Sequence, residues 1–243
     1  MAIGMLRPGA RLAALALIAA GVGMAQKVIS AKAGLVYFVE GHAAVAGSGP
    51  LAAGEVNRQL NPGEILFSEN GRAEVLLNPG TVLRIGDRTA IRMDRVELTD
   101  ARVSVEAGSA VVTVYQAPKL DRVEIGIGGA VVKMEGAGVY RFDSDGSDRG
   151  ALRVFSGQAF VYRENGVYRE GGASQAVAKR GQAVRLQDLQ VGKFDVKAAD
   201  ALQQWAETRG APPPWTPLPP MQRLSPPAKT PEFEAWLKEC GQR

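Results

Sequence analysis

The side chains that could perform chemistry are few in this sequence. The chain has one histidine, His42, and one cysteine, Cys240. A Ser-His-Asp or Cys-His arrangement would have to use His42, because no other imidazole exists, and no G-x-S-x-G segment is present. His42 lies in a stretch that favours a strand, so we expect it to be an exposed strand residue. We expect no catalytic residue.

The segment DSDGSD superficially resembles a calcium loop, because it places Asp143, Asp145 and Asp148 close together. The EF-hand pattern fails, since Ser147 occupies its fifth position and Asp148 stands where glycine is required. A solvated hairpin turn is therefore expected here. Zinc would need a group of His or Cys ligands that the chain lacks. We expect no metal and no cofactor.

Two other patterns could suggest enzymes. GIGG, at Gly126–Gly129, could be taken for a phosphate-binding loop, but no Lys-Ser/Thr pair follows it, so a turn is expected. Paired carboxylates hydrolyse glycosides, and any two acids can converge in a fold. Glu74 and Glu97 alternate with apolar residues, which predicts solvent-exposed strand positions. A hydrolase acting on an envelope polysaccharide stays open as an alternative.

The N-terminus has the pattern of a secretory signal peptide over residues 1–25. Arg7 and Arg11 are followed by the apolar run Leu12–Ala20 and by small residues, which predicts cleavage between Ala25 and Gln26. The apolar run is shorter than the roughly 20 residues that cross a membrane. The mature protein is expected to be periplasmic or secreted, without a stable membrane span.

Charge and cysteine content narrow the classes of partner. Loss of the two N-terminal arginines leaves a net charge of about +2, which provides no basic surface for nucleic acid. A single cysteine excludes an intramolecular disulfide. An intermolecular disulfide through Cys240 is left open. The stability of the fold is expected to come from packing alone.

The body of the chain, residues 29–190, reads as an all-β domain. Alternating and β-branched runs predict strands, and Asn-Pro-Gly and Glu-Asn-Gly segments predict turns between them. The strand-like runs are Val82–Ile85, Ala90–Met93, Val96–Thr99, Ala110–Val114, Val123–Ile127 and Ala130–Met134, and the turn segments start at Asn61, Asn78, Glu69 and Glu164. We predict an irregular β-roll or sandwich of short antiparallel strands and hairpins, followed by one or two short helices.

The pattern of glycine, a variable residue, alanine and a mostly apolar strand-like run recurs along the chain, as at Gly41, Gly71, Gly108, Gly157 and Gly181. We expect each glycine to close a turn in a conformation that other residues resist, and each alanine to lie where backbones approach closely. The irregular spacing excludes a solenoid of fixed period.

Helices are predicted only near the C-terminus. A first helix is expected over residues 194–210, with Asp195 as its cap and Gly210 at its end, packed on or following the β-domain. Leu202, Trp205 and Ala206 fall near one face of it.

A proline-rich linker is expected at 211–229, and a short amphipathic helix at 230–240. Trp215 in the linker and Trp236 in the last helix are candidate anchors for a partner. The alternative is that both tryptophans pack onto the body and cover a sheet edge.

The order of these elements resembles a known family. Leu60–Ile85, LNPGEILFSENGRAEVLLNPGTVLRI, is similar to the signature of FecR-type extracytoplasmic domains. VSVEAGSAVVTV, VVKMEGAGVYRFD, LRVFSGQAFVY and AKRGQAVRL resemble the later elements of that family. Ala137 stands where the family usually has threonine. The resemblance spans roughly Ile29 to Leu189.

The resemblance implies an all-β extracytoplasmic domain without catalytic residues. In regulatory members of the family, the domain receives a signal from an outer-membrane transporter and passes it through a membrane helix to a sigma-factor-binding segment. Our leading hypothesis is a free-standing exported module that binds a protein or another component of the bacterial envelope. The alternative is a membrane-anchored component of an anti-sigma type system, with the signal peptide retained as the anchor.

Overall fold

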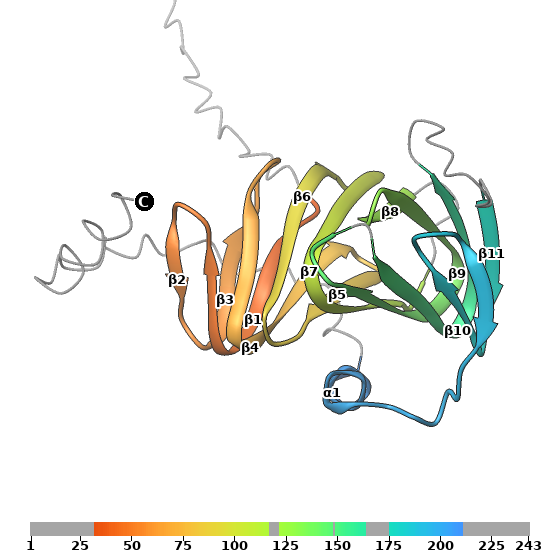
Figure 1. The fold of residues 1–243 in the computed structure, drawn as a ribbon. Helices are drawn as coiled ribbons and strands as arrows, with labels where there is room; N and C mark the ends of the chain where they lie inside the picture. The colour runs from red at the N-terminus through yellow and green to blue at the C-terminus, as the bar shows by residue number, and fades with distance from the viewer. Residues whose placement is uncertain (1–31, 117–121, 148, 164–174, 211–243) are drawn as a thin grey trace, which may run out of the picture. The chain divides into compact units, whose positions relative to one another are not determined.

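The computed structural model describes residues 32–116, 122–147, 149–163 and 175–210, which contain thirteen strands and one helix (Figure 1). The strands are β1 (Leu35–Val45), β2 (Gly49–Leu51), β3 (Gly54–Gln59), β4 (Ile65–Asn78), β5 (Thr81–Ile85), β6 (Thr89–Glu97), β7 (Asp100–Val114), β8 (Arg122–Ile127), β9 (Ala130–Ser144), β10 (Gly150–Arg163), β11 (Gln175–Lys179), β12 (Gln182–Arg185) and β13 (Gln190–Lys193). The helix is α1 (Ala201–Arg209). The all-β prediction with a short helix after the strands is confirmed.

All the strands belong to one hydrogen-bonded sheet, ordered β13-β12-β10-β9-β8-β7-β5-β4-β1-β2, with β3, β6 and β11 beside this path. Every pairing is antiparallel except β7 with β8, which is parallel. The strands are also longer than predicted, since β7 and β9 each have 15 residues. From the sequence, strands are predicted to end at glycines, whereas in the structure these glycines lie inside longer strands.

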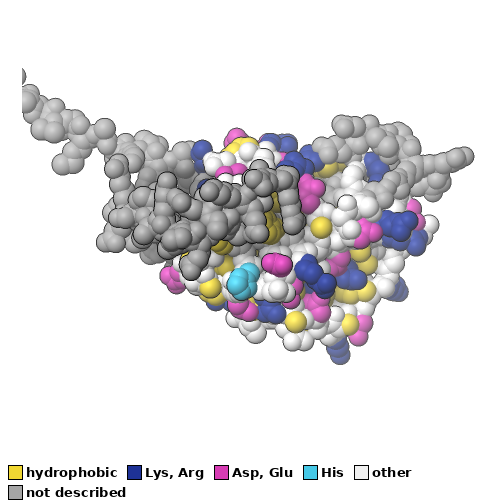
Figure 2. All heavy atoms as spheres, turned by 60° about the vertical axis from the view of Figure 1, so that its left-hand side comes forward, with side chains coloured by type: hydrophobic (Ala, Val, Ile, Leu, Met, Phe, Trp, Pro, Cys, Tyr) yellow, Lys and Arg dark blue, Asp and Glu magenta, His cyan; other side chains and the backbone are white. Residues whose placement is uncertain are grey.

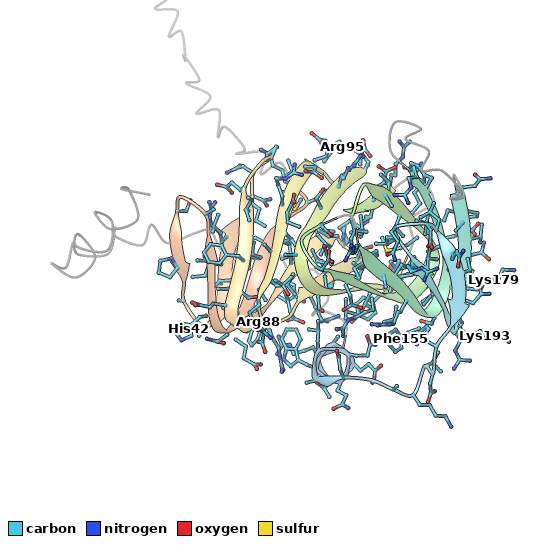
Figure 3. All side chains as sticks on the ribbon, viewed as in Figure 1. His42, Arg88, Arg95, Phe155, Lys179 and Lys193 are labelled. Atoms are coloured by element: carbon cyan, nitrogen blue, oxygen red, sulfur yellow. The ribbon has the colours of Figure 1, made fainter. Side chains whose placement is uncertain are left out.

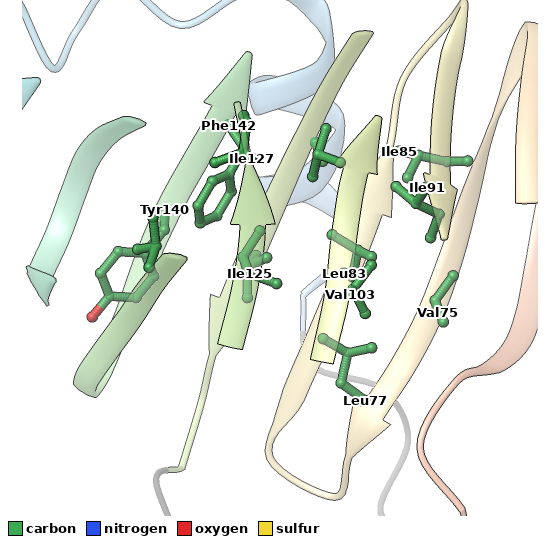
Figure 4. Close-up of a cluster of buried hydrophobic side chains, with 14 of the residues drawn as sticks. Val75, Leu77, Leu83, Ile85, Ile91, Val103, Ile125, Ile127, Tyr140 and Phe142 are labelled. Carbon is green, nitrogen blue, oxygen red and sulfur yellow. The ribbon is translucent and has the colours of Figure 1, made fainter. Parts of the chain in front are cut away.

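The long strands change neighbours half-way along their length, so each contributes to two sets of pairings. The first half of β4 pairs with β6 and its second half with β5. In the same way β10 pairs with β12 and then with β11. Side chains from both halves, such as Leu66 and Val75 of β4, enter one hydrophobic core, part of which is shown in Figure 4. The two halves therefore form the walls of a common interior.

Four of the five recurring glycines lie inside strands, where the neighbour or the register changes, and only Gly181 closes a turn. The expectation that each glycine closes a turn is wrong for Gly41, Gly71, Gly108 and Gly157. At Gly108 the backbone has a φ of +85°, and a Cβ there would lie 2.5 Å from the carbonyl oxygen of Arg88. Glycine thus allows a bend in which two backbones approach closely.

Some of the predicted turns are present in the structure, and one is not. Asn78-Pro79-Gly80 connects β4 to β5, and Pro62-Gly63 forms a turn before β4, as predicted. The hairpin expected at Asn70-Gly71 is wrong, because both residues lie within β4, opposite the irregular part of β1. The segment starting at Glu164 lies outside the described residues.

Helix α1 is shorter than predicted, because it begins at Ala201 rather than near residue 194. Its N-cap is Asp200 instead of Asp195, since the Asp200 carboxylate accepts a hydrogen bond of 2.9 Å from the Gln203 amide. Gly210 ends the helix with a φ of +63°, as expected.

No helix in the described part of the chain is long and apolar enough to span a membrane. The predicted cleavage site at Ala25 and Gln26, the candidate anchors Trp215 and Trp236, and Cys240 lie outside the residues that the structure describes.

Candidate functional site

The outer surface of the sheet beneath α1 carries a buried pair of opposite charges. Glu74 of β4 and Arg84 of β5 are cross-strand partners, and the Arg84 Nε lies 2.7 Å from the Glu74 Oε1. Their side chains are 1% and 0% exposed. The expectation that Glu74 is exposed is therefore wrong, whereas Glu97 is exposed as predicted. Glu74 is buried because a residue far along the chain covers it.

That residue is Arg209, the last residue of α1. Its Nε and one terminal nitrogen donate hydrogen bonds of 3.1 and 2.7 Å to the Glu74 Oε2. Its guanidinium carbon lies 3.9 Å from the centroid of the Phe38 ring, within range for a cation–π contact. The two carboxylate oxygens of Glu74 are thus shared between one arginine of the sheet and one of the helix.

The C-terminal end of α1 is held by the same part of the sheet. Arg84 donates from its other nitrogens to the Gly210 carbonyl oxygen at 2.6 Å and to the Thr113 hydroxyl at 3.2 Å. The Tyr115 hydroxyl donates to the same carbonyl oxygen of Gly210. These donors satisfy one of the carbonyl groups that every helix leaves without an intrahelical partner. The sheet therefore caps the helix at this end.

A second arginine of the sheet holds the N-terminal end of α1. Arg141 of β9 donates at 2.6 Å to the carboxylate of Asp200 and at 2.9 Å to Asp143. Partial burial by itself would raise the pKa of Asp200, but hydrogen bonds from Arg141 and the Gln203 amide outweigh it and lower the pKa below its ordinary value. The Asp200 carboxylate is therefore ionised, and it accepts hydrogen bonds from both the Gln203 amide and Arg141.

Between its ends, the helix rests on a small apolar area. Leu202 and Ala206 pack on Val111 of β7, with Trp205 partly buried beside them. The Trp205 indole N–H donates at 3.0 Å to the carboxylate of Glu40. Figure 1 shows α1 beside the strands and outside their interior. The docking of α1 is therefore mainly polar, with charge contacts at both ends.

An irregularity in β1 supplies two aromatic residues to this site. Val36 and Val39 both point into the core although they are three residues apart, because the register of β1 shifts between Val36 and Phe38. The extra residue places both Tyr37 and Phe38 near the site. Burial, reinforced by the Glu74 carboxylate, raises the pKa of Tyr37 well above its ordinary value of 10. Tyr37 therefore stays a neutral hydroxyl beside the carboxylate.

A cavity of about 310 Å³ lies between the sheet and the segment that leads into α1. Its lining residues are Arg141, Arg153, Phe155, Phe194, Asp195, Ala198 and Asp200. The rings of Phe155 and Phe194 meet edge to face, with centroids 5.0 Å apart. Arg141 and Arg153 are both paired with Asp143. The arrangement is suited to holding the segment before α1 against the sheet.

The residues singled out for chemistry lie apart from this site or serve it structurally. His42 is exposed in β1, on the edge of the molecule labelled in Figure 3. Asp143 of the supposed calcium loop binds Arg141, Arg153 and the Ser109 hydroxyl. Gly128 and Gly129 form a turn between β8 and β9, as predicted. Among the described residues, no group of His, Cys, Asp or Glu has the arrangement of a metal site.

On the part of the face in Figure 2 that the described residues form, basic and acidic side chains are interspersed. What the site offers is a set of paired charges and hydrogen-bond donors that fit the two ends of a short helix. Glu74 and Asp200 are both bound by arginine, which favours a binding role over proton transfer.

The family model described as FecR protein matches residues 64–160. Residues 64–160 are therefore similar to a FecR domain. The match starts just before β4 and ends within β10, so the matched region includes Glu74, Arg84 and Arg141, whereas α1 lies beyond it. A FecR domain supports a role in signalling or sensing.

Two crystal structures of a protein described as a candidate anti-sigma factor from Parabacteroides distasonis ATCC 8503 are similar to the chain. Each is 18% identical to it, with TM-scores of 0.43 and 0.42. The similarity covers 60% and 59% of this chain, and 64% and 63% of the other, so the chain spans less than two thirds of that protein. No curated protein matches the chain.

Proposed function

We propose that this chain is a non-catalytic, exported FecR-domain protein that senses a signal or binds a component of the bacterial envelope through protein contacts. The observation that carries the proposal is the FecR match at residues 64–160, in a sheet whose outer face binds a helix at both ends through arginine side chains. Recognition of that kind needs no bound cofactor and no reaction.

The location follows from the N-terminal sequence. Residues 1–25 have the pattern of a signal peptide with cleavage after Ala25, and FecR domains are extracytoplasmic. N-terminal sequencing of the exported protein tests this point. A first residue of Gln26 supports release from the membrane, whereas an uncleaved N-terminus supports a membrane-anchored component of an anti-sigma type system.

The partner is expected to be a protein, and Trp215 and Trp236 are proposed as additional anchors outside the β-domain. Affinity capture from envelope extracts would compare the full chain with a chain ending at Gly210 and with a full chain carrying Trp215→Ala and Trp236→Ala. We expect one envelope protein to be enriched by the full chain, and enriched less when the tryptophans are lost. Equal capture of the same protein by all three would exclude the anchors while keeping the binding role.

A different experimental result would contradict the whole proposal. An absence of any enriched envelope component, together with hydrolysis of cell-wall glycan by the purified chain, would replace the binding role with an enzymatic one.

A further inference from the structure

We propose that Glu74, Phe38 and Tyr37 form a recognition site for an arginine side chain of a partner protein, and that Arg209 of α1 occupies this site until the partner displaces it. The inference deepens the proposed function, because it gives the chemistry by which one partner would be recognised. It rests on three properties of the site: its selectivity, its rigidity and the weak hold on its present occupant.

The site is selective for a guanidinium group. Two nitrogens of Arg209 bind the same oxygen of Glu74, while its guanidinium carbon lies 3.9 Å from the centroid of the Phe38 ring. A lysine ammonium has a single nitrogen, so it cannot bring two nitrogens to the Glu74 oxygen while a third atom of the same group lies over the Phe38 ring. The geometry therefore distinguishes arginine from lysine, which bears the same charge.

The site persists when Arg209 leaves. The Glu74 carboxylate is held from the other side by Arg84, its cross-strand partner, and both lie on strands of a continuous sheet. The irregularity in β1 fixes Tyr37 and Phe38 at its edge. Side chains positioned by strands and by second contacts form a more rigid site than side chains on loops. An incoming arginine would find the oxygen of Glu74 already aimed outward.

The present occupant is held weakly enough to be exchanged. Helix α1 has nine residues, which is fewer than an isolated helix needs for stability in water. Leu202 and Ala206 are its buried apolar side chains. The Arg209 side chain is 36% exposed, so a partner can approach the site from solvent while the helix is in place. The Glu74 side chain on the other side of this contact is 1% exposed, so exchange requires the C-terminal end of α1 to move away from the sheet.

The test uses purified full-length chain with Nα-acetyl-arginine amide as the probe and Nα-acetyl-lysine amide as its matched control. The variant Arg209→Ala empties the site, and Arg185→Ala removes an exposed arginine that is paired with Asp188 away from α1. Binding is followed by NMR titration. We expect Arg209→Ala to bind the arginine probe at least tenfold more tightly than the wild-type chain and the Arg185→Ala variant.

Two further results are required by the proposal. Phe38→Leu in the Arg209→Ala background keeps an apolar side chain at the edge of the site and should weaken probe binding about tenfold, whereas the lysine probe should bind poorly to every variant. In the wild-type chain, a saturating concentration of the arginine probe should speed hydrogen exchange of the α1 amides, and the lysine probe should not.

Equal binding of the two probes, or equal affinity of the wild-type and Arg209→Ala chains, would overturn the arginine site and leave Arg209 as a structural contact of α1. Because the test needs no envelope partner, such a result would leave the FecR-domain binding role standing. Conversely, a failed capture from envelope extracts would not alter the outcome of the probe titrations.

Discussion

At the scale of single residues, substitution within the buried pair of Glu74 and Arg84 should be strongly destabilising. Glu74→Gln removes the negative charge and leaves the guanidinium of Arg84 buried without a counter-charge, which costs about 3–5 kcal/mol. Urea denaturation measures the loss. Glu97→Gln, at an exposed position of β6, should change the free energy of unfolding by less than about 0.5 kcal/mol. Similar losses for both variants would contradict the burial of Glu74.

The carboxylate of Asp200 makes the docking of α1 depend on pH. Its pKa is lowered in the folded state, so its contribution is fully present above its ordinary value of 3.8 and is lost as the pH falls further through the lowered value. NMR signals of α1 should therefore report undocking only below about pH 4. Asp200→Asn should weaken docking at neutral pH and remove the part of the acid dependence that Asp200 causes. An unchanged acid profile in this variant would assign the effect to other carboxylates.

Part of this site could be predicted from the sequence. The turn at Asn78-Pro79-Gly80 predicts the hairpin of β4 and β5, but counting outward from the Asn78–Thr81 pair places Glu74 opposite Ile85. A register shift between Leu76 and Asn78 moves the pairing by one residue and brings Glu74 opposite Arg84. Burial of the pair could not be predicted in this way, because it depends on Arg209, which is 135 residues away along the chain. Alternation between polar and apolar residues identifies the outer face of a strand, but it does not reveal what covers that face.

At the scale of elements, glycine inside a strand has two separable roles. Gly108→Ala should cost about 1–2 kcal/mol for the left-handed backbone and about 1–3 kcal/mol more for the close approach to Arg88 and Thr89. Gly136→Ala in β9 has the same backbone requirement but nothing within 4 Å of the added Cβ, so it should cost only the first amount. Thermal or urea unfolding of both variants measures the difference. Equal costs would show that the close approach is relieved by small backbone shifts.

The type of each element could be predicted from the sequence better than its first and last residues. Turn residues such as those at Asn78 and Gly128 are correctly identified, because proline and glycine restrict the local backbone wherever they occur. The same requirement for a positive φ arises at a turn and at a bend inside a strand, so the sequence does not distinguish Gly108 from Gly181. Likewise, Asp195 and Asp200 are equal candidates for the helix cap, and the contact of Asp200 with Arg141 favours the second.

At the scale of the whole molecule, α1 and the sheet should open independently. Leu202→Ala should speed hydrogen exchange of the α1 amides while the amides of β4 and β7 keep their protection, because Leu202 belongs to the small cluster outside the main core. Leu83→Ala, inside the main core, should lower the free energy of global unfolding by about 2–5 kcal/mol. Loss of protection in all strands upon Leu202→Ala would mean that the helix and the sheet unfold as one unit.

The sharing of long strands between two sets of neighbours has a consequence for how the protein can be divided. A fragment cut at the limits of the family match, 64–160, would strip β1 from one side of β4 and leave β10 without β11 and β12. Both cuts would create bare sheet edges that invite self-association. A fragment that keeps these pairings must therefore include β1, β11 and β12, beyond the limits of the family match on both sides.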